Sequence, residues 1–305
     1  MLKVAPDAKE VRGGGTVLDA LRAMRVYQWS KNFLVFAPVF LSHTIFQAQR
    51  FLHAAEAFLA FSAAASALYI VNDLLDLEAD RQHPRKRFRP FAQGKLSIGH
   101  GKLLAAVLFF IAAGISLLMP LQAGMGIVLY VFTGLFYSFY LKRLLFVDVI
   151  TLASLYTLRL LVGGLATAVT ISPWTLAFSI FVFTSLAICK RLSELRAYDL
   201  QQNPLLPARA YSQNDLVSLT SLSSSSGYAA VVVLALYFNS PEVMVLYQHP
   251  RVMWLLLPLL TYWISRAIVI ANRGEMHHDP IVFAFGDPAS WAAGLLTLAI
   301  VVGAL

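Results

Sequence analysis

The chain contains few charged residues. Only 13% of its 305 residues are Asp, Glu, Lys or Arg, whereas 58% are hydrophobic and the mean hydropathy is +0.67. Soluble domains usually carry about 25% charged residues, so this composition predicts a chain surrounded by lipid. No Pro-, Gly- or Ser-rich linker separates the hydrophobic segments. We therefore expect a single integral-membrane domain over residues 1–305, with 1–20 as a flexible N-terminal segment.

Cysteine is also nearly absent. The single Cys189 excludes an intramolecular disulfide and any metal site built from several cysteines. The first 30 residues lack a long apolar run, which argues against a cleavable signal peptide. The formal net charge is +8. In so hydrophobic a chain, this charge is better explained by cytoplasmic loops rich in Lys and Arg than by a nucleic-acid partner, and we expect no nucleic acid to bind.

Apolar segments long enough to span a bilayer, about 20 residues each, recur along the chain. They predict an all-α, polytopic membrane protein with about nine transmembrane helices. The first predicted span is the weakest, because Pro38 and His43 interrupt it. The nine expected spans are residues 31–48, 52–77, 101–119, 121–141, 147–169, 173–190, 216–238, 252–272 and 285–305.

The basic residues are distributed unevenly between the predicted loops. If the N-terminus lies inside, the loops on that side hold 20 of the 24 Lys and Arg residues. The outer loops hold only Arg50 and Arg251. Because positive loops stay in the cytoplasm, we expect a multi-pass protein of a bacterial inner membrane with a cytoplasmic N-terminus.

An acidic motif closes the second predicted span. Asn72, Asp76 and Asp80 recur every four residues, and Asp73 joins the same side of a continuous helix. Such close carboxylates repel one another unless a cation joins them. Mg²⁺ takes hard oxygen ligands, usually one or two carboxylates together with phosphate oxygens. Because the motif begins inside an apolar span, where ionisable groups are usually functional, a Mg²⁺-bound diphosphate is favoured over a solvated helix end.

A basic loop follows the acidic motif at once. Pro84 and Pro90 predict a rigid loop instead of a helix, and Arg85, Lys86 and Arg89 between them can pair with phosphates. Taken alone, such a run is typical of a cytoplasmic loop. Directly after acidic metal ligands, it predicts a Mg²⁺–diphosphate site at one membrane face.

Other polar residues lie in or beside the predicted spans. Arg159 falls within the fifth span, where it needs either an ion-pair partner or an anionic ligand, and both readings stay open. Lys190 and Glu194 follow the sixth span and could form a simple i, i+4 pair. For the last inner loop, with its His-His-Asp run ending at Asp279, an ordinary loop is preferred to a metal site.

The run Asn72–Asp80 resembles the NDxxDxxxD motif of the UbiA superfamily of intramembrane prenyltransferases. The resemblance covers about residues 20–300 and implies the UbiA-type transferase fold, nine transmembrane helices, a lateral opening to lipid and Mg²⁺ as cofactor. Finer features resemble the decaprenyl-phosphate phosphoribosyltransferase branch. These features are Gln28-Trp-Ser-Lys-Asn32, the HPxKxxRP run that ends at Pro90, Lys142 with Asp148, Leu158–Gly164, Lys190-Arg-Leu-Ser-Glu194 and the segment from Asp279.

This branch implies an activity and a set of site residues. The activity is transfer of 5-phosphoribosyl from phosphoribosyl diphosphate (PRPP) to a polyprenyl (decaprenyl) phosphate, which makes a lipid-linked precursor of cell-envelope arabinose donors. Asp73, Asp76 and Asp80 are the candidate catalytic residues and, with Asn72, the candidate metal ligands. The candidate substrate-binding residues are Lys31, Asn32, Arg85, Lys86, Arg89, Tyr137, Lys142, Asp148, Arg159, Lys190, Arg191 and Glu194. The implied partners are PRPP, a polyprenyl phosphate and the lipid bilayer; the oligomeric state stays open, a homo-oligomer included.

Two other functions fit parts of the sequence. A UbiA-type prenyltransferase would move a polyprenyl group from its diphosphate to an aromatic acceptor. Typical members of that kind carry a second Asp-rich motif after the sixth helix, where this chain has the basic run that begins at Lys190. A transporter would place ionisable groups at mid-membrane, often within inverted repeats. Phosphoribosyl transfer is therefore predicted, with prenyl transfer as the alternative.

Overall fold

The computed structural model describes residues 16–82, 86–199, 210–276 and 279–305, and this part of the chain is helical without any β-strand. The α-helices are α1 (Val17–Met24), α2 (Ala37–Leu41), α3 (Ala48–Leu75), α4 (Leu77–Gln82), α5 (Ile98–Leu118), α6 (Leu121–Phe139), α7 (Val147–Thr167), α8 (Pro173–Asp199), α9 (Leu216–Phe238), α10 (Pro241–Leu246), α11 (Leu256–Asn272), α12 (Pro280–Gly286) and α13 (Pro288–Ala304). The 3₁₀-helices are η1 (Val26–Phe36), η2 (Lys86–Phe88), η3 (Leu141–Arg143), η4 (Gln213–Asp215) and η5 (Pro250–Leu255).

The expected fold class, an all-α polytopic membrane protein, is confirmed. Among the described residues, seven helical segments are long and apolar enough to cross a membrane, and α12 with α13 would add an eighth span that is bent by 86°. The predicted number of about nine spans is therefore approximate. Of the segment 1–20 expected to be flexible, residues 1–15 lie outside the described residues and α1 begins at Val17.

The first expected span, 31–48, is not a continuous helix. The chain forms the 3₁₀-helix η1, then the five-residue α2, and reaches His43 with a φ of 55°. Pro38 at the start of α2 cannot donate a backbone hydrogen bond. Lys31 and Asn32 would be costly to expose to lipid. In a 3₁₀-helix, residues three apart share a face, so this winding can turn both side chains into the protein.

One face of η1 packs against α3. The Trp29 indole donates to Ser66 Oγ at 3.0 Å, and the Asn32 amide donates to Ser62 Oγ at 3.0 Å. Because residues three apart share one face of η1 and residues four apart share one face of α3, the two pairs repeat the same contact one turn further on. Val35 continues this face and is fully buried. These contacts fix η1 beside the acidic motif of α3.

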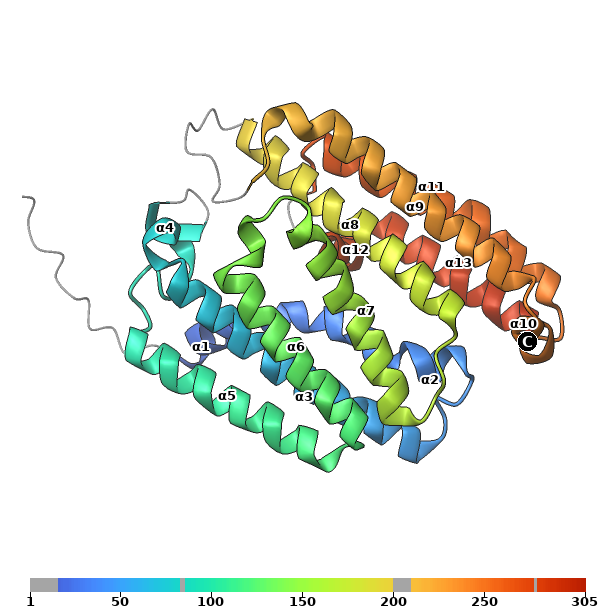
Figure 1. Cartoon of the computed structure of the whole chain (residues 1–305), viewed down its shortest axis with the longest axis horizontal. Helices are drawn as coiled ribbons and strands as arrows, with labels where there is room; N and C mark the ends of the chain where they lie inside the picture. Colours follow the sequence, from blue (N-terminus) through green and yellow to red (C-terminus); the bar gives the residue numbers. More distant parts are fainter. Residues whose placement is uncertain (1–15, 83–85, 200–209, 277–278) are drawn as a thin grey trace, which may run out of the picture.

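The helices form one bundle in which α7 contacts elements from both halves of the chain. α3 packs on α5, α6 and α7, whereas α8 packs on α7, α9 and α11. Figure 1 shows α5 along one edge and α9 with α11 along the opposite edge, while α4 and the connection from α6 to α7 lie at the same end. Along α3, small side chains allow this close approach. They include Ala57, Ala60, Ala64 and Ala67, all fully buried.

Gly163 of α7 lies against the backbone of η1, and we expect Gly163→Ala to displace that helix. A Cβ at this position would come within 2.2 Å of the Val35 carbonyl oxygen. η1 must shift to make room for the Cβ, and this shift should lower the free energy of unfolding by about 1–3 kcal/mol. It should also reduce activity, because η1 carries Lys31. Melting temperature in detergent measures the first effect. Gly114→Ala in α5 is the matched control, since no atom lies within 4 Å of its Cβ; equal losses in both variants would contradict the prediction.

Candidate active site

The acidic motif lies at the end of α3. The helix ends at Leu75, Asp76 is its C-cap, and α4 follows directly. The helix does not continue without a break to Asp80, since it is interrupted at Asp76. The backbone bonds from Asp76 N–H to Asn72 O (3.0 Å) and from Asp80 N–H to Asp76 O (2.8 Å) nevertheless continue the four-residue repeat. The backbone of the motif thus keeps the helical repeat on which the spacing argument depends.

Two arginines bind the first and last carboxylates of the motif. Arg89 Nη1 lies 3.1 Å from Asp73 Oδ1 and 2.5 Å from Asp80 Oδ2. Arg25 Nη2 lies 2.5 Å from the same oxygen of Asp73. Asp73 and Asp80 are each only 2% exposed, so these carboxylates need such partners. Arg25 is not among the candidate site residues, although its three-residue spacing from Gln28 and Lys31 on one 3₁₀ face could have indicated it.

Lys142 of η3 binds the middle of the motif. Its Nζ lies 2.8 Å and 2.9 Å from the two carboxylate oxygens of Asp76 and 3.2 Å from Asn72 Oδ1. Three oxygens from two side chains therefore surround one cationic atom. The structure brings together Lys142 and the acidic motif although 66 residues separate Lys142 from Asp76.

The oxygens of the motif converge in two pairs. Asn72 and Asp76 meet at Lys142, and Asp73 and Asp80 meet at Arg89. In the described part of the chain, no group of three or more His, Cys, Asp or Glu residues could hold a metal ion alone. Mg²⁺ usually takes only one or two carboxylates and completes its octahedron with phosphate oxygens and water. The donor set therefore fits a Mg²⁺ that binds together with a phosphate ligand, and not an all-protein cage.

A second charged cluster centres on Asp279, which sequence reasoning did not include in the site. Lys31 Nζ lies 2.8 Å and Lys190 Nζ 3.1 Å from its Oδ2, and the Tyr156 hydroxyl donates to Oδ1 at 3.2 Å. Burial raises the pKa of Asp279, but the two lysines outweigh this effect and hold its pKa well below the usual range. Lys190 thus pairs with Asp279, and the i, i+4 pair considered with Glu194 is not the contact observed.

A third cluster joins α7, α8 and the chain before η4. Arg191 is 1% exposed, lies 3.2 Å from Asp148 Oδ2 through Nε, and pairs with Glu194. The Tyr211 hydroxyl donates to Asp148 Oδ1 at 2.6 Å and accepts from the Phe146 N–H at 3.0 Å. Phe146 has a φ of 64°, a rare conformation for a bulky residue. Tyr211 is not among the residues predicted from the sequence, because nothing in its local sequence indicates a partner 63 residues earlier.

Arg159 lies on the same helix as Asp148, α7, but apart from the Asp148–Arg191 cluster. It is 11 residues beyond Asp148 on α7, which corresponds to about 16 Å along the helix. Its guanidinium donates to Asn32 Oδ1 (2.8 Å), the Tyr130 hydroxyl (2.8 Å) and the Leu155 carbonyl (2.6 Å). These partners are neutral. The aromatic rings of Phe61, Tyr130 and Tyr156 also lie within cation–π distance.

The remaining candidate residues link the clusters. Lys86 of η2 interacts electrostatically with both Asp80 and Glu194. Tyr137 of α6 interacts electrostatically with Lys190 and Arg191. Arg85 lies outside the described residues.

The sequence profile of the UbiA prenyltransferase family matches residues 33–287. The chain belongs to this family. Among solved structures, the UbiA homolog from Archaeoglobus fulgidus bound to GPP and Mg²⁺ superposes with a TM-score of 0.69 over 93% of this chain and 99% of that one. At 16% identity, this likeness shows the fold alone.

Three relatives differ in how much of the chain they cover. Nodulation protein NoeC of Azorhizobium caulinodans is 35% identical over 88% of this chain and 87% of its own length. The uncharacterized protein y4nM of Sinorhizobium fredii is 38% identical over 92% of this chain, which spans 54% of that protein. The decaprenyl-phosphate phosphoribosyltransferase of Corynebacterium glutamicum is 35% identical over 59% of this chain and 55% of its own length.

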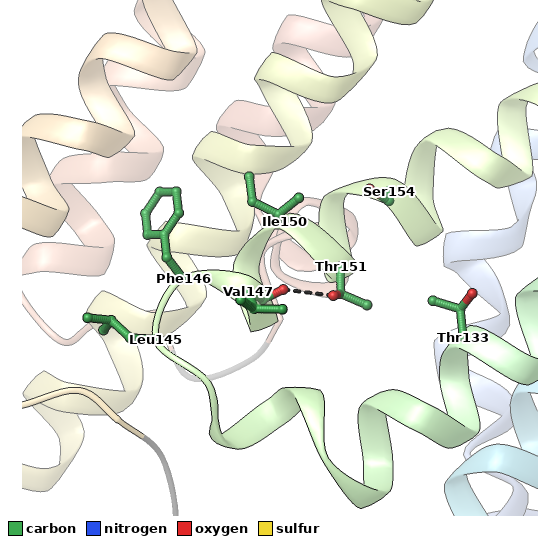
Figure 2. Close-up of a pocket in the computed structure, with 7 residues that line it drawn as sticks. All are labelled: Thr133, Leu145, Phe146, Val147, Ile150, Thr151 and Ser154. Carbon is green, nitrogen blue, oxygen red and sulfur yellow. Dashed lines mark hydrogen bonds between the residues drawn. The ribbon is translucent and has the colours of Figure 1, made fainter.

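In this UbiA family member, a groove of about 370 Å³ opens between α6 and α7. Figure 2 shows the side chains that line it. The one hydrogen bond drawn there joins the Thr151 hydroxyl to the Val147 carbonyl at 2.7 Å, so this hydroxyl is satisfied within its own helix. Phe146 lines the groove and bonds Tyr211 through its N–H, so the groove adjoins the Asp148–Arg191 cluster. The lining residues are Thr133, Leu145, Phe146, Val147, Ile150, Thr151 and Ser154.

Proposed function

We propose that the chain transfers 5-phosphoribosyl from PRPP to a polyprenyl phosphate such as decaprenyl phosphate, with release of diphosphate. The observation that carries this proposal is the cationic end of α8. There, Lys190 joins Lys31 at Asp279, and Arg191 is buried beside Asp148. A second metal–diphosphate site would need a group of carboxylates at this place, whereas cations suit an acceptor that carries a phosphate. The similarity to a named phosphoribosyltransferase over part of the chain supports the same reaction.

The acidic motif would bind the diphosphate of PRPP. Asn72, Asp73, Asp76 and Asp80 are the residues that would hold Mg²⁺, whose charge, when bound, stabilises the departing diphosphate. Arg89, Lys142 and Lys86 would bind the phosphate oxygens. Arg89 and Lys142 now pair with the motif's carboxylates, so both ammonium and guanidinium groups already lie where the diphosphate would arrive.

The reaction needs orientation more than proton transfer. An oxygen of the acceptor phosphate attacks C1 of the ribose, the bond from C1 to the diphosphate oxygen breaks, and its electron pair leaves with diphosphate. The acceptor phosphate is ionised at neutral pH, so no strong general base is required. Lys31, Lys190, Arg191 and Tyr137 would orient the anions, with Asp148 and Glu194 holding Arg191. Asn32 and Arg159 would support η1 from the deeper side.

The proposed orientation places the N-terminus and the active site at the cytoplasmic face of a bacterial inner membrane. PRPP is water soluble and would reach the acidic motif from the cytosol. The polyprenyl tail would stay in lipid, and the groove between α6 and α7 offers it an apolar wall beside the Arg191 cluster (Figure 2). The product would be a lipid-linked phosphoribose, a precursor of cell-envelope arabinose donors.

The alternative is prenyl transfer from a polyprenyl diphosphate to an aromatic acceptor. One observation favours it: the Archaeoglobus fulgidus neighbour that shares the fold is bound to GPP and Mg²⁺. The acidic motif alone suits either diphosphate. The cations of α8 are what favour phosphoribosyl transfer.

Purified protein supplied with radiolabelled PRPP, Mg²⁺ and decaprenyl phosphate should move the label into the organic phase. EDTA should abolish this transfer, because the diphosphate would lose its counter-ion. A parallel reaction with a polyprenyl diphosphate and an aromatic acceptor tests the alternative. Turnover only in that parallel reaction would reject phosphoribosyl transfer and establish prenyl transfer in its place.

A further inference from the structure

Two lysines from distant parts of the chain share one oxygen atom. Lys31 of η1 and Lys190 of α8 both bind Asp279 Oδ2, at 2.8 Å and 3.1 Å, so their ammonium nitrogens lie less than 6 Å apart. The other oxygen of Asp279 accepts from the Ile281 N–H at 3.3 Å and from the Tyr156 hydroxyl. Asp279 therefore has a fixed orientation at the N-terminus of α12 and holds the two lysines close together.

This cluster has an excess of positive charge. Two ammonium groups face one carboxylate, and the side chains of Lys31 and Asp279 are only 6% and 8% exposed. Arg25 and Arg159 also act on Lys31 and increase the positive potential there. Buried charge is unfavourable unless it is compensated. An anion that binds between the lysines would supply that compensation.

The ammonium groups have the donors and the access that an anion needs. Each has three N–H donors, and one from each is directed at Asp279. Lys190 is 27% exposed, so the cluster is open on its side. Lysine binds phosphate as a compact point charge, and two such charges under 6 Å apart suit one phosphate group.

We propose that Lys31 and Lys190, positioned by Asp279, form a binding site for one phosphate monoester. Asp279 is a positioning residue, since it holds the lysines and does not itself contact the anion. The inference rests on the proposed function only for the two sources of this chemistry, the polyprenyl phosphate and the 5-phosphate of PRPP. It assigns the lysine pair to a monoester and leaves the diphosphate to the acidic motif.

Binding to the full-length protein in detergent tests the site directly. Isothermal titration with geranyl phosphate, ribose 5-phosphate and inorganic phosphate should show that one of the two esters binds. Lys190→Met should lower the binding affinity for that ester at least tenfold, because one of the two cations is lost. Asp279→Asn should also lower this affinity, and Asp279→Glu should retain part of it.

The matched control is Asp287→Asn. Asp287 also caps a helix, α13, and binds a cation, with its oxygens 2.6 Å and 2.9 Å from Arg266. Loss of the Asp287 carboxylate should destabilise the fold to a similar degree without lowering the binding affinity for the ester. A second measurement on the wild type avoids variants that fail to fold: the ester should protect Lys190 from an amine-acetylating reagent, as read by mass spectrometry.

The outcomes separate the site from the reaction. Unchanged ester affinity in Lys190→Met, or no protection of Lys190, would overturn the phosphate site even if phosphoribosyl transfer is observed. Ester binding that depends on Lys190 would uphold the site even if the label from PRPP never reaches lipid. Ribose 5-phosphate as the ligand would identify the donor's 5-phosphate, and geranyl phosphate would identify the acceptor.

Discussion

Asp73→Asn is expected to reduce phosphoribosyl transfer by at least about a hundredfold, the effect of removing one electrostatic group from a catalytic site. Asp73 is 2% exposed and binds both Arg25 and Arg89. The substitution would remove the charge of a proposed metal ligand and leave the two guanidinium groups without this shared carboxylate. Initial rates of label transfer from PRPP to lipid, measured across a Mg²⁺ titration, check the expectation.

The control for this variant is Glu78→Gln in α4. Glu78 lies five residues from Asp73, but its side chain is 80% exposed and pairs only at the surface with Arg81. Exposed pairs contribute little, so its transfer rate should stay close to that of the wild type. If both variants lost activity equally, a direct role for Asp73 would be rejected.

Arg191→Met is expected to impair both stability and activity. Asp148 is fully buried, and Arg191 is the guanidinium beside it. Removing one partner of a buried ion pair typically destabilises a protein by about 3–5 kcal/mol. The variant should therefore unfold at a lower temperature in detergent and should bind the anionic substrate weakly.

A double variant separates these two effects. Adding Asp148→Asn to Arg191→Met removes the fully buried charge that Arg191 had balanced and should recover much of the lost stability, because the two residues are in contact. It should not recover activity, since the cation is still missing. Recovery of both would mean that Arg191 is purely structural. Tyr211→Phe, which removes the hydroxyl bound to Asp148, should destabilise the protein less than Arg191→Met.

Several parts of the fold and the site followed from local sequence. Helical spacing predicted Asn72, Asp76 and Asp80 on one side of the chain, and the backbone bonds at the end of α3 keep the helical repeat on which that spacing depends. The apolar runs gave the class of protein and most of its spans. These predictions succeeded because they depend on residues a few positions apart, whose relative placement is fixed by helix geometry alone.

The first span shows where local pattern failed. Residues 31–48 have the length and composition of a transmembrane helix, yet η1 is a 3₁₀-helix and α2 is short. Local hydrophobicity could not indicate that Lys31 would find Asp279, or that Asn32 would find Ser62 and Arg159. The hydrogen bonds to those distant partners are what make the tighter winding favourable.

The sequence by itself determined the membrane class, the acidic motif with its adjacent basic loop, and the family resemblance. The tertiary structure alone decided which charges meet. Arg25 and Arg89 bind Asp73, Lys142 binds Asp76, and Asp279 gathers two lysines that are 159 residues apart. The physical reason is that a buried charge requires a partner within a few ångströms, and only the packing of helices from distant parts of the chain determines which partner that is.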